Sequence, residues 1–218
     1  DGPPGRLNLA ELRVLRREAD PRPNVVLYVI DCLRADHVGA YGYARRTTPR
    51  LDALAREGAL FEDVTACAAW TKPSTACLFT SRPATEHGAQ TVDDRLDEAH
   101  VTLAEALGAA GYSTAALVDN PLVSSRSFGL APGFDRVAQV ARATRGANIN
   151  DLEAEAVHLT RRADGWLRRH SDERFFAYVH SLDLHAAYRW RPGFSGRFAR
   201  RETATELDLY DGELVAND

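Results

Sequence analysis

The amino-acid sequence predicts an α/β fold in which helices flank a largely parallel central sheet. Continuous apolar and β-branched runs at residues 24–30, 112–118 and 174–180 are typical of strands that are buried on both faces. Helical patterns separate these runs, and strands that alternate with helices favour a parallel sheet. The chain has 218 residues, of which 44% are hydrophobic and 27% charged, so it is long enough to bury one sizeable core.

The first part of the chain divides into a polar start and the beginning of the domain. Residues 1–23 are polar and rich in proline, and we interpret them as a leader or linker. The domain is expected to occupy residues 24–218. After the first strand, Thr48 followed by Pro49 is a typical helix start, and it predicts a helix at 49–58. Residues 59–64 are predicted to form a short strand that leads to the next polar segment.

The second part alternates in the same way. A helix is predicted at residues 101–110, where Gly111 ends it. Residues 124–150 are loop-like because glycine and proline recur in them. A long helix with one apolar side is predicted at 151–170, and a final helix from about residue 203 to the end. Every predicted strand is therefore followed by at least one helix.

Composition excludes some classes of partner. The formal net charge is −4 and no basic stripe stands out, so we expect no nucleic-acid partner. We interpret adjacent arginines such as Arg161 and Arg162 as solvated helix faces. No run approaches the roughly 18 apolar residues of a membrane span. The chain begins at Asp1 and contains no methionine, so it could have lost an upstream targeting or anchoring segment.

Three cysteines, Cys32, Cys67 and Cys77, are an odd number at irregular spacing. This pattern predicts neither a disulfide framework nor a zinc site. Each cysteine lies in apolar sequence, which favours a buried free thiol at all three positions.

Polar side chains follow the three strong strands at the edge where a parallel sheet binds ligands. Asp31 follows the first strand and Asn120 follows the second. The third strand ends in a group that contains His180, Asp183 and His185. These side chains are expected to converge, although Asp31 alone could equally cap a helix.

Residues 70–75 combine two hydroxyl side chains with Lys72, the only lysine in the chain. On their own they are compatible with a simple helix start that has Pro73 in its first turn. Together with the strand ends they suit the transfer of a tetrahedral anion. A divalent metal at Asp31 would lower the pKa of the Thr71 hydroxyl, and Lys72 and a histidine would offset charge on the transferred group. Oxygen ligands favour Mg, Mn or Ca, whereas histidine ligands favour Zn or Mn.

Four motifs resemble the sulfatase family of the alkaline phosphatase superfamily. They lie at residues 24–43, 48–61, 70–80 and 180–188, and the resemblance runs in order over about residues 24–215. It implies an alkaline-phosphatase-like α/β domain.

The resemblance also implies roles for individual residues. Asp31 matches a metal-binding aspartate, and Thr71 matches the nucleophile, which also touches the metal. His185 matches a histidine that contacts the transferred group, and is therefore both a catalytic and a substrate-binding candidate. Lys72 and Asn120 lie where substrate contacts are expected.

Three departures from the family pattern change the expected chemistry. The family nucleophile is a Cys or Ser that is converted to formylglycine, and Thr71 does not undergo this conversion, so no formylglycine is expected. Cys32 stands where many sulfatases have a second metal-binding aspartate. The chain contains no Asp-His-Gly sequence, which in the family supplies further metal ligands. We therefore expect a domain that is truncated at its C-terminus.

The sequence thus favours a metal-dependent hydrolase or transferase of phosphate or sulfate esters, with phosphate esters preferred because the nucleophile is threonine. One alternative is a sulfuric ester hydrolase, and a second is a truncated or non-catalytic binding domain. The resemblance alone implies a small-molecule, lipid or glycan ester as substrate, and an extracytoplasmic or membrane-associated location.

Overall fold

The computed structural model describes residues 21–124, 128–140, 156–185 and 187–218. Four parallel strands form one sheet in the order β1-β4-β2-β3. The strands are β1 (Val25–Ile30), β2 (Ser113–Val118), β3 (Arg136–Gln139) and β4 (Phe175–Ser181). The α-helices are α1 (Pro49–Glu57), α2 (Thr71–Thr80), α3 (Ala84–His87), α4 (Leu103–Ala109), α5 (Pro121–Ser124), α6 (Ala156–Arg169) and α7 (Glu206–Asn217). The predicted α/β fold with a parallel sheet is confirmed.

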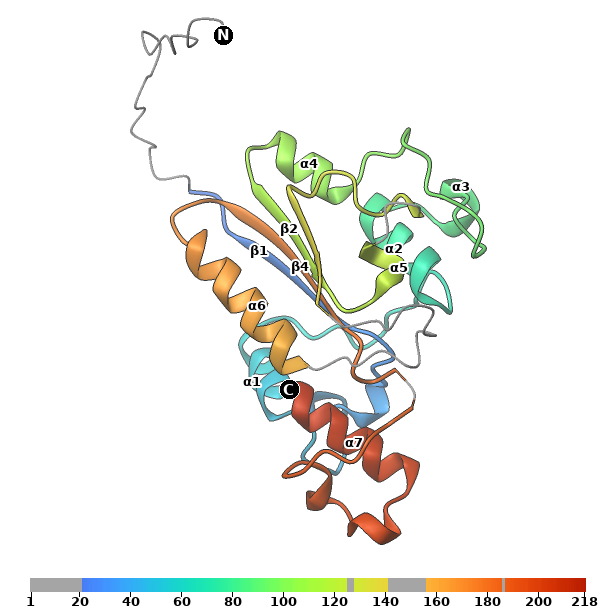
Figure 1. Cartoon of the computed structure of the whole chain (residues 1–218), viewed down its shortest axis with the longest axis vertical. Coiled ribbons are helices and arrows are strands. Elements are labelled where there is room, and N and C mark those ends of the chain that lie inside the picture. The colour runs from blue at the N-terminus through green and yellow to red at the C-terminus, as the bar shows by residue number, and fades with distance from the viewer. Residues whose placement is uncertain (1–20, 125–127, 141–155, 186) are drawn as a thin grey trace, which may run out of the picture.

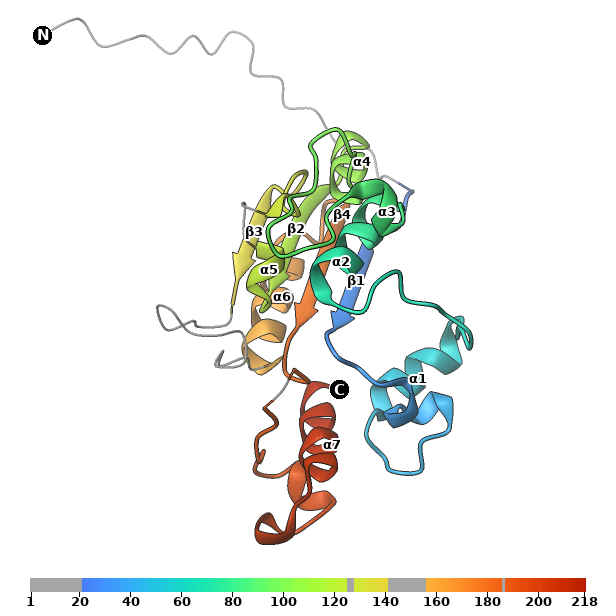
Figure 2. The ribbon, with the colours of Figure 1, turned by 90° about the vertical axis from the view of Figure 1, so that its right-hand side faces the viewer.

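Helices cover the sheet on both faces. Helices α2, α4 and α5 lie on one face and α6 lies on the other (Figures 1 and 2). On the first face, Phe79 of α2 packs edge-on against Tyr178 of β4. On the second face, Trp166 of α6 packs edge-on against Phe175 of β4. The sheet therefore has a separate apolar layer on each side, as expected for a parallel sheet.

The prediction that the strands are buried on both faces holds for the central strands but is wrong for β1. Every residue of β4 is buried, and β2 is buried from its second residue onward. In β1, by contrast, Val26 and Tyr28 are 52% and 40% exposed. Helix α6 packs against β2 and β4, and in the described part of the chain it does not cover the face of β1 from which these two side chains project.

Two other expectations are corrected. Residues 59–64 form no strand, since Phe61 and Val64 are 70% and 73% exposed and no strand pairs with them. The region expected to be loop-like contains β3, which pairs with β2. A run of β-branched and apolar residues becomes a strand only where a neighbouring strand offers hydrogen-bonding partners, and sequence periodicity does not reveal that neighbour.

The predicted helices are present, with small shifts at their ends. Helix α4 begins two residues later than expected, after Thr102, and α7 begins after Thr205. Each of these threonines forms a capping box, with Glu105 and Asp208 respectively, and this fixes the first turn. The predicted leader at 1–23 lies almost entirely outside the described residues, as do residues 151–155 of the predicted long helix. No helix in the described ranges is long and apolar enough to cross a membrane.

Helix α7 holds the segment that follows β1. The Tyr210 hydroxyl donates to the Cys32 carbonyl at 3.0 Å and accepts from the Arg34 N–H at 2.8 Å. His37 is buried and its Nδ1 lies 2.7 Å from the carboxylate of Asp211. These contacts between residues almost 180 positions apart fix the backbone immediately after Asp31.

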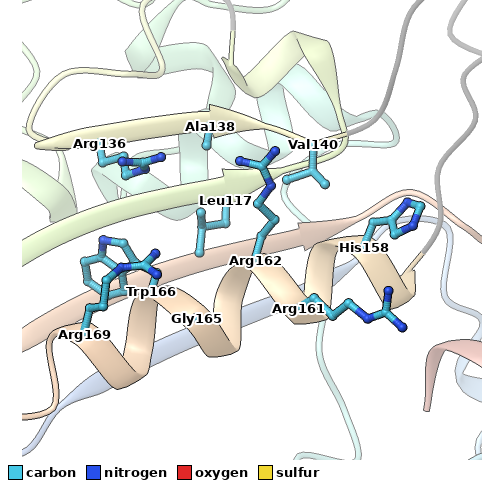
Figure 3. Close-up of a pocket in the computed structure, with 10 residues that line it drawn as sticks. All are labelled: Leu117, Arg136, Ala138, Val140, His158, Arg161, Arg162, Gly165, Trp166 and Arg169. Carbon is cyan, nitrogen blue, oxygen red and sulfur yellow. The ribbon is translucent and has the colours of Figure 1, made fainter.

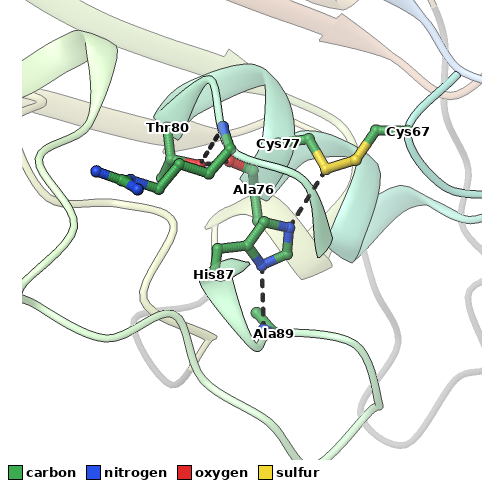
Figure 4. Close-up of a disulfide and its surroundings, with 7 residues drawn as sticks. Cys67, Ala76, Cys77, Thr80, His87 and Ala89 are labelled. Carbon is green, nitrogen blue, oxygen red and sulfur yellow. Dashed lines mark hydrogen bonds between the residues drawn. A yellow bond between two sulfur atoms is a disulfide. The ribbon is translucent and has the colours of Figure 1, made fainter. Parts of the chain in front are cut away.

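The cysteines differ from expectation. Cys67 and Cys77 form a disulfide with a Cα–Cα distance of 6.4 Å, and Cys32 is exposed (Figure 4). The Nε2 of His87 lies 3.3 Å from the Cys77 sulfur, while the Ala89 N–H donates to His87 Nδ1 at 3.1 Å. The prediction of three buried free thiols is therefore wrong. The apolar neighbours of Cys67 gave no sign that its loop folds back onto α2.

This disulfide is expected to stabilise the segment that carries Thr71. Its sequence separation is only 10 residues, for which chain entropy gives about 3 kcal/mol of stabilisation. The double variant Cys67→Ala/Cys77→Ala should therefore lower the free energy of unfolding in urea by that amount. The reductant dithiothreitol should lower the stability of the wild-type protein similarly and leave the double variant unchanged. The variant Cys32→Ala serves as the control, and equal stability of the wild type and the double variant would contradict the assignment.

Candidate active site

Asp31 lies at the carboxyl end of β1, one residue past the strand. Its N–H donates to the Ser181 carbonyl at 3.0 Å, so the ladder between β1 and β4 continues to this position. The next residue, Cys32, has a φ of 58°, a left-handed conformation that turns the chain sharply away from the sheet. The carboxylate of Asp31 is left at the sheet edge and caps no helix, which resolves the two interpretations of this residue.

Three side chains contact one oxygen of Asp31. The Thr71 hydroxyl donates to Oδ2 at 3.0 Å, and the Asn120 side-chain amide donates to it at 2.8 Å. The Nε2 of His180 lies 3.3 Å from the same oxygen. The Asn120 Nδ2 and Thr71 Oγ1 atoms are 3.5 Å apart. Of the side chains predicted to converge at this edge, Asp31, Thr71, Asn120 and His180 lie side by side in the structure.

Each contact is positioned by a different element. Thr71 is the first residue of α2, and Trp70 precedes it in an extended conformation. Asn120 follows β2 and is fully buried. Its Oδ1 accepts a hydrogen bond from the Leu122 N–H at 2.9 Å, which turns its Nδ2 toward Asp31. The hydroxyl and the amide are therefore held by the start of a helix and by the turn after a strand.

His180 lies in β4, opposite Val29 of β1. Its Nδ1 is 2.8 Å from the hydroxyl of Tyr178, and both side chains are buried. Burial strongly raises the pKa of Tyr178, so its hydroxyl stays protonated. The Asp31 carboxylate can only accept a hydrogen bond, which makes Nε2 of His180 the donor and leaves Nδ1 to accept from Tyr178. We therefore assign the ring proton of His180 to Nε2, from which it is donated to Asp31.

Hydrogen bonding keeps Asp31 ionised. Burial by itself raises the pKa of the carboxyl group, but hydrogen bonds from His180, Asn120 and Thr71 outweigh it and lower the pKa to about 2. At neutral pH the site therefore contains a fixed carboxylate beside a hydroxyl group. The thiol of Cys32 lies 3.6 Å from the other oxygen, Oδ1, and burial and the charge of Asp31 raise its pKa to about 11.

In the structure the Lys72 ammonium group contacts the protein itself, and its predicted substrate contact stays a prediction. Its side chain is fully buried, and Nζ donates to the carbonyls of Thr91 and Val92 at 2.9 and 3.0 Å and to that of Asp94. Nζ also lies 4.4 Å from the centroid of the Phe128 ring. Three carbonyls use all three donors of the ammonium group, so Lys72 supports the loop beside α2.

The histidine at Asp31 is His180, while the family resemblance gives His185 a different role, contact with the transferred group. His185 lies half-buried in the turn after β4, where its N–H donates to the Leu182 carbonyl at 3.0 Å. Its contact with a transferred group stays a prediction. The strand register that places His180 beside Asp31 is set by the pairing of β1 with β4, and no local sequence pattern reports it.

The donors at this edge fit part of a divalent-metal site. Asp31 offers carboxylate oxygens and Thr71 a hydroxyl oxygen, donors that suit Mg, Mn or Ca. His180 would add an imidazole nitrogen, which suits Zn or Mn, only after its proton moves from Nε2 to Nδ1, where the Tyr178 hydroxyl would accept it. In the ranges that the structure describes, no third acidic, thiol or imidazole side chain completes a ligand cluster with Asp31 and His180. The chain's described residues thus account for some positions of such a site.

Comparison with known proteins identifies related sequences. The family model described as "Sulfatase" matches residues 23–218. An N-acetylglucosamine-6-O-sulfatase of Bacteroides thetaiotaomicron is 30% identical over 133 residues, which cover 61% of this chain and 23% of that protein. The chain thus spans about a quarter of the length of this curated relative.

Solved structures share the fold. A phosphonate monoester hydrolase of Agrobacterium radiobacter has a TM-score of 0.66 at 20% identity, covering 90% of this chain and 57% of the solved one. The C-terminal periplasmic domain of EcEptC from Escherichia coli, in complex with Zn, has a TM-score of 0.68 at 18% identity, covering 93% and 58%. These likenesses confirm an alkaline-phosphatase-like fold.

Proposed function

The chain belongs to the sulfatase family, and on this premise we propose that the complete protein transfers or hydrolyses phosphate esters with Thr71 as its nucleophile. The observation that carries the proposal is the hydrogen bond of 3.0 Å from the Thr71 hydroxyl to the ionised carboxylate of Asp31. Asn120 and His180 hold that carboxylate in place. The homologues support an ester hydrolase, and the choice of nucleophile and substrate is our proposal.

The Thr71 oxygen would attack the phosphorus atom while the bond from phosphorus to the leaving alcohol oxygen breaks. The leaving alkoxide takes up a proton, and water or an acceptor alcohol then displaces Thr71 from the phosphorylated intermediate. Asp31 orients the Thr71 hydroxyl but is a weak base, because its pKa is about 2. The proton that Thr71 releases therefore passes to solvent and does not remain on Asp31.

A divalent metal held by Asp31, Thr71 and His180 would supply positive charge that lowers the pKa of the hydroxyl. The chain contributes positive potential of its own, because Thr71 opens the ten-residue helix α2. The first turn of a helix leaves N–H groups without intrahelical acceptors, and its dipole favours an anion. A phosphoryl oxygen beside Thr71 would meet these N–H groups.

Phosphate esters are favoured over sulfate esters because of the side chain at position 71. A threonine hydroxyl attacks directly and leaves a covalent ester, whereas the family's sulfatases use formylglycine in place of Cys or Ser. Sulfate-ester hydrolysis by an unmodified threonine is the alternative that the name of the matching family model supports. A small-molecule, lipid or glycan ester remains the proposed substrate class.

We also propose an extracytoplasmic location. The disulfide between Cys67 and Cys77 supports it, because such bonds persist in oxidising compartments.

The proposal is tested with the complete protein, loaded in turn with Mg, Mn, Ca and Zn. Nitrophenyl phosphate, bis(nitrophenyl) phosphate and nitrophenyl sulfate are compared by kcat/KM for each metal. We expect at least one phosphate ester to exceed the sulfate ester by about tenfold or more. A preference for the sulfate ester would instead favour the sulfatase alternative, and absence of turnover with every metal would favour a non-catalytic binding domain.

A further inference from the structure

A hollow of about 550 Å³ lies between helix α6 and the strand β3, on the face of the sheet opposite α2 (Figures 1 and 3). Its floor consists of apolar side chains from the sheet and the indole of Trp166, which is 3% exposed. Its walls carry four arginines, Arg136, Arg161, Arg162 and Arg169, together with His158. No carboxylate is among the described residues that line it.

The arginines line one hollow because the spacing of residues on α6 and on β3 places them on the two faces that border it. On α6, residues 158, 161, 162, 165 and 169 follow the spacing of one helix face. On β3, residues 136, 138 and 140 alternate onto one face of the sheet. Figure 3 shows Arg162 rising from the helix toward Ala138 and Val140, and Arg169 reaching over Trp166. The face of α6 beside β3 is therefore basic, and the exposed side chains of Arg161 and Arg162 also line the hollow.

The four guanidinium groups are not neutralised within the described part of the chain. No carboxylate there lies within ion-pair distance of any of them. Arg168, on the same helix but outside the hollow, pairs with Asp164 at 2.8 Å. Like charges gathered around one space repel one another, and an anion in that space would relieve the repulsion.

We propose that this hollow binds a small ligand that carries two or more tetrahedral oxyanion groups, sulfate or phosphate. Arginine matches such groups because its planar fork donates two parallel hydrogen bonds. A nucleic acid fits less well, since Trp166 is buried and offers no ring face for stacking, and the net charge of the chain is −4. Helix α6, which borders the hollow, and helix α2, which begins with Thr71, lie on opposite faces of the sheet, so this binding is independent of the chemistry at Thr71 (Figure 2).

The test measures binding to the purified protein by isothermal titration calorimetry. A fully sulfated heparin tetrasaccharide and inositol hexakisphosphate serve as the two probes, and whichever binds more tightly identifies the source of the oxyanions. Two variants probe the two walls separately: Arg136→Gln on β3, and Arg162→Gln/Arg169→Gln on α6. All three side chains are exposed, so folding is expected to be retained and is checked by thermal melting. Arg168→Gln is the matched control from the same helix.

We expect the double variant to weaken the binding of the preferred probe by at least about tenfold, and Arg136→Gln by a smaller factor. Arg168→Gln should stay within about twofold of the wild type. Raising the salt from about 50 to about 200 mM should weaken binding to the wild type more than to the double variant. The proposal is overturned if neither probe binds at about 1 mM, or if the control loses as much affinity as the double variant.

Discussion

Replacing Thr71 by valine is expected to reduce kcat/KM on the preferred ester by at least about 1,000-fold. Valine keeps the shape of the side chain and removes the hydroxyl that donates to Asp31 at 3.0 Å. Thr71→Ser, which restores a hydroxyl in the same place, should retain measurable turnover and form a covalent phosphoserine that mass spectrometry detects. The assay uses the complete protein with the metal that gives the highest activity.

Thr80→Val is the matched control for this prediction. Thr80 ends the same helix, and its hydroxyl donates to the Ala76 carbonyl at 2.7 Å. Nine residues of helix separate it from Thr71, a rise of about 13 Å. Its removal should leave kcat/KM almost unchanged. If Thr71→Val were as active as the wild type, the assignment of Thr71 as the nucleophile would be contradicted.

Replacing Lys72 by methionine is expected to lower the free energy of unfolding by about 3 kcal/mol, because three carbonyls of the loop at 91–94 would lose a charged hydrogen-bond donor. Methionine fills much of the same space but cannot donate to Thr91, Val92 and Asp94. It also removes the cation over the ring of Phe128. For a chain of this length, the melting temperature should fall by about 10 °C. Urea unfolding and thermal melting measure the two quantities.

Arg82→Met is the control for Lys72, since it also replaces a cation by an apolar side chain. Arg82 is exposed and pairs with Glu86 at 3.1 Å on the surface. A surface pair of this kind contributes about 0.5 kcal/mol or less. If Lys72→Met were as stable as the control but bound substrate weakly, the ammonium group would belong to the substrate site after all.

Thr71 and Lys72 show that adjacent residues of one sequence motif can have different surroundings in the fold. Both stood in one polar segment, and both were candidates for the reaction. Adjacent residues at a helix start point about 100° apart around the axis, so they face different surroundings. Thr71 faces Asp31, whereas Lys72 faces the carbonyls of the loop at 91–94. The rotation of α2 against the sheet separates their roles, and tertiary packing sets that rotation.

The contacts of the cysteines and the histidines also depend on tertiary packing, between residues further apart in the chain. Cys67 and Cys77 were predicted as buried thiols from their apolar neighbours, but their disulfide depends on whether the loop that carries Cys67 meets helix α2, which carries Cys77. Three polar residues near the end of the third strand, His180, Asp183 and His185, were candidates for the sheet edge, and the structure shows that His180 is the one that contacts Asp31. The pairing of Val29 with His180 across β1 and β4 decides this, and such pairing joins residues about 150 positions apart.

The sequence by itself determined the α/β class, the main helices and the strand ends at which Asp31, Thr71 and Asn120 meet. This was possible because apolar runs specify strands and glycine or proline specifies where elements end, both through local interactions. Parallel strands then bring their carboxyl ends to one edge of the sheet. Only the tertiary structure decided that His180 contacts Asp31, that Lys72 serves the fold, and that arginines of α6 and β3 surround one hollow. These features depend on strand register and helix rotation, which are fixed by packing between segments distant in the chain.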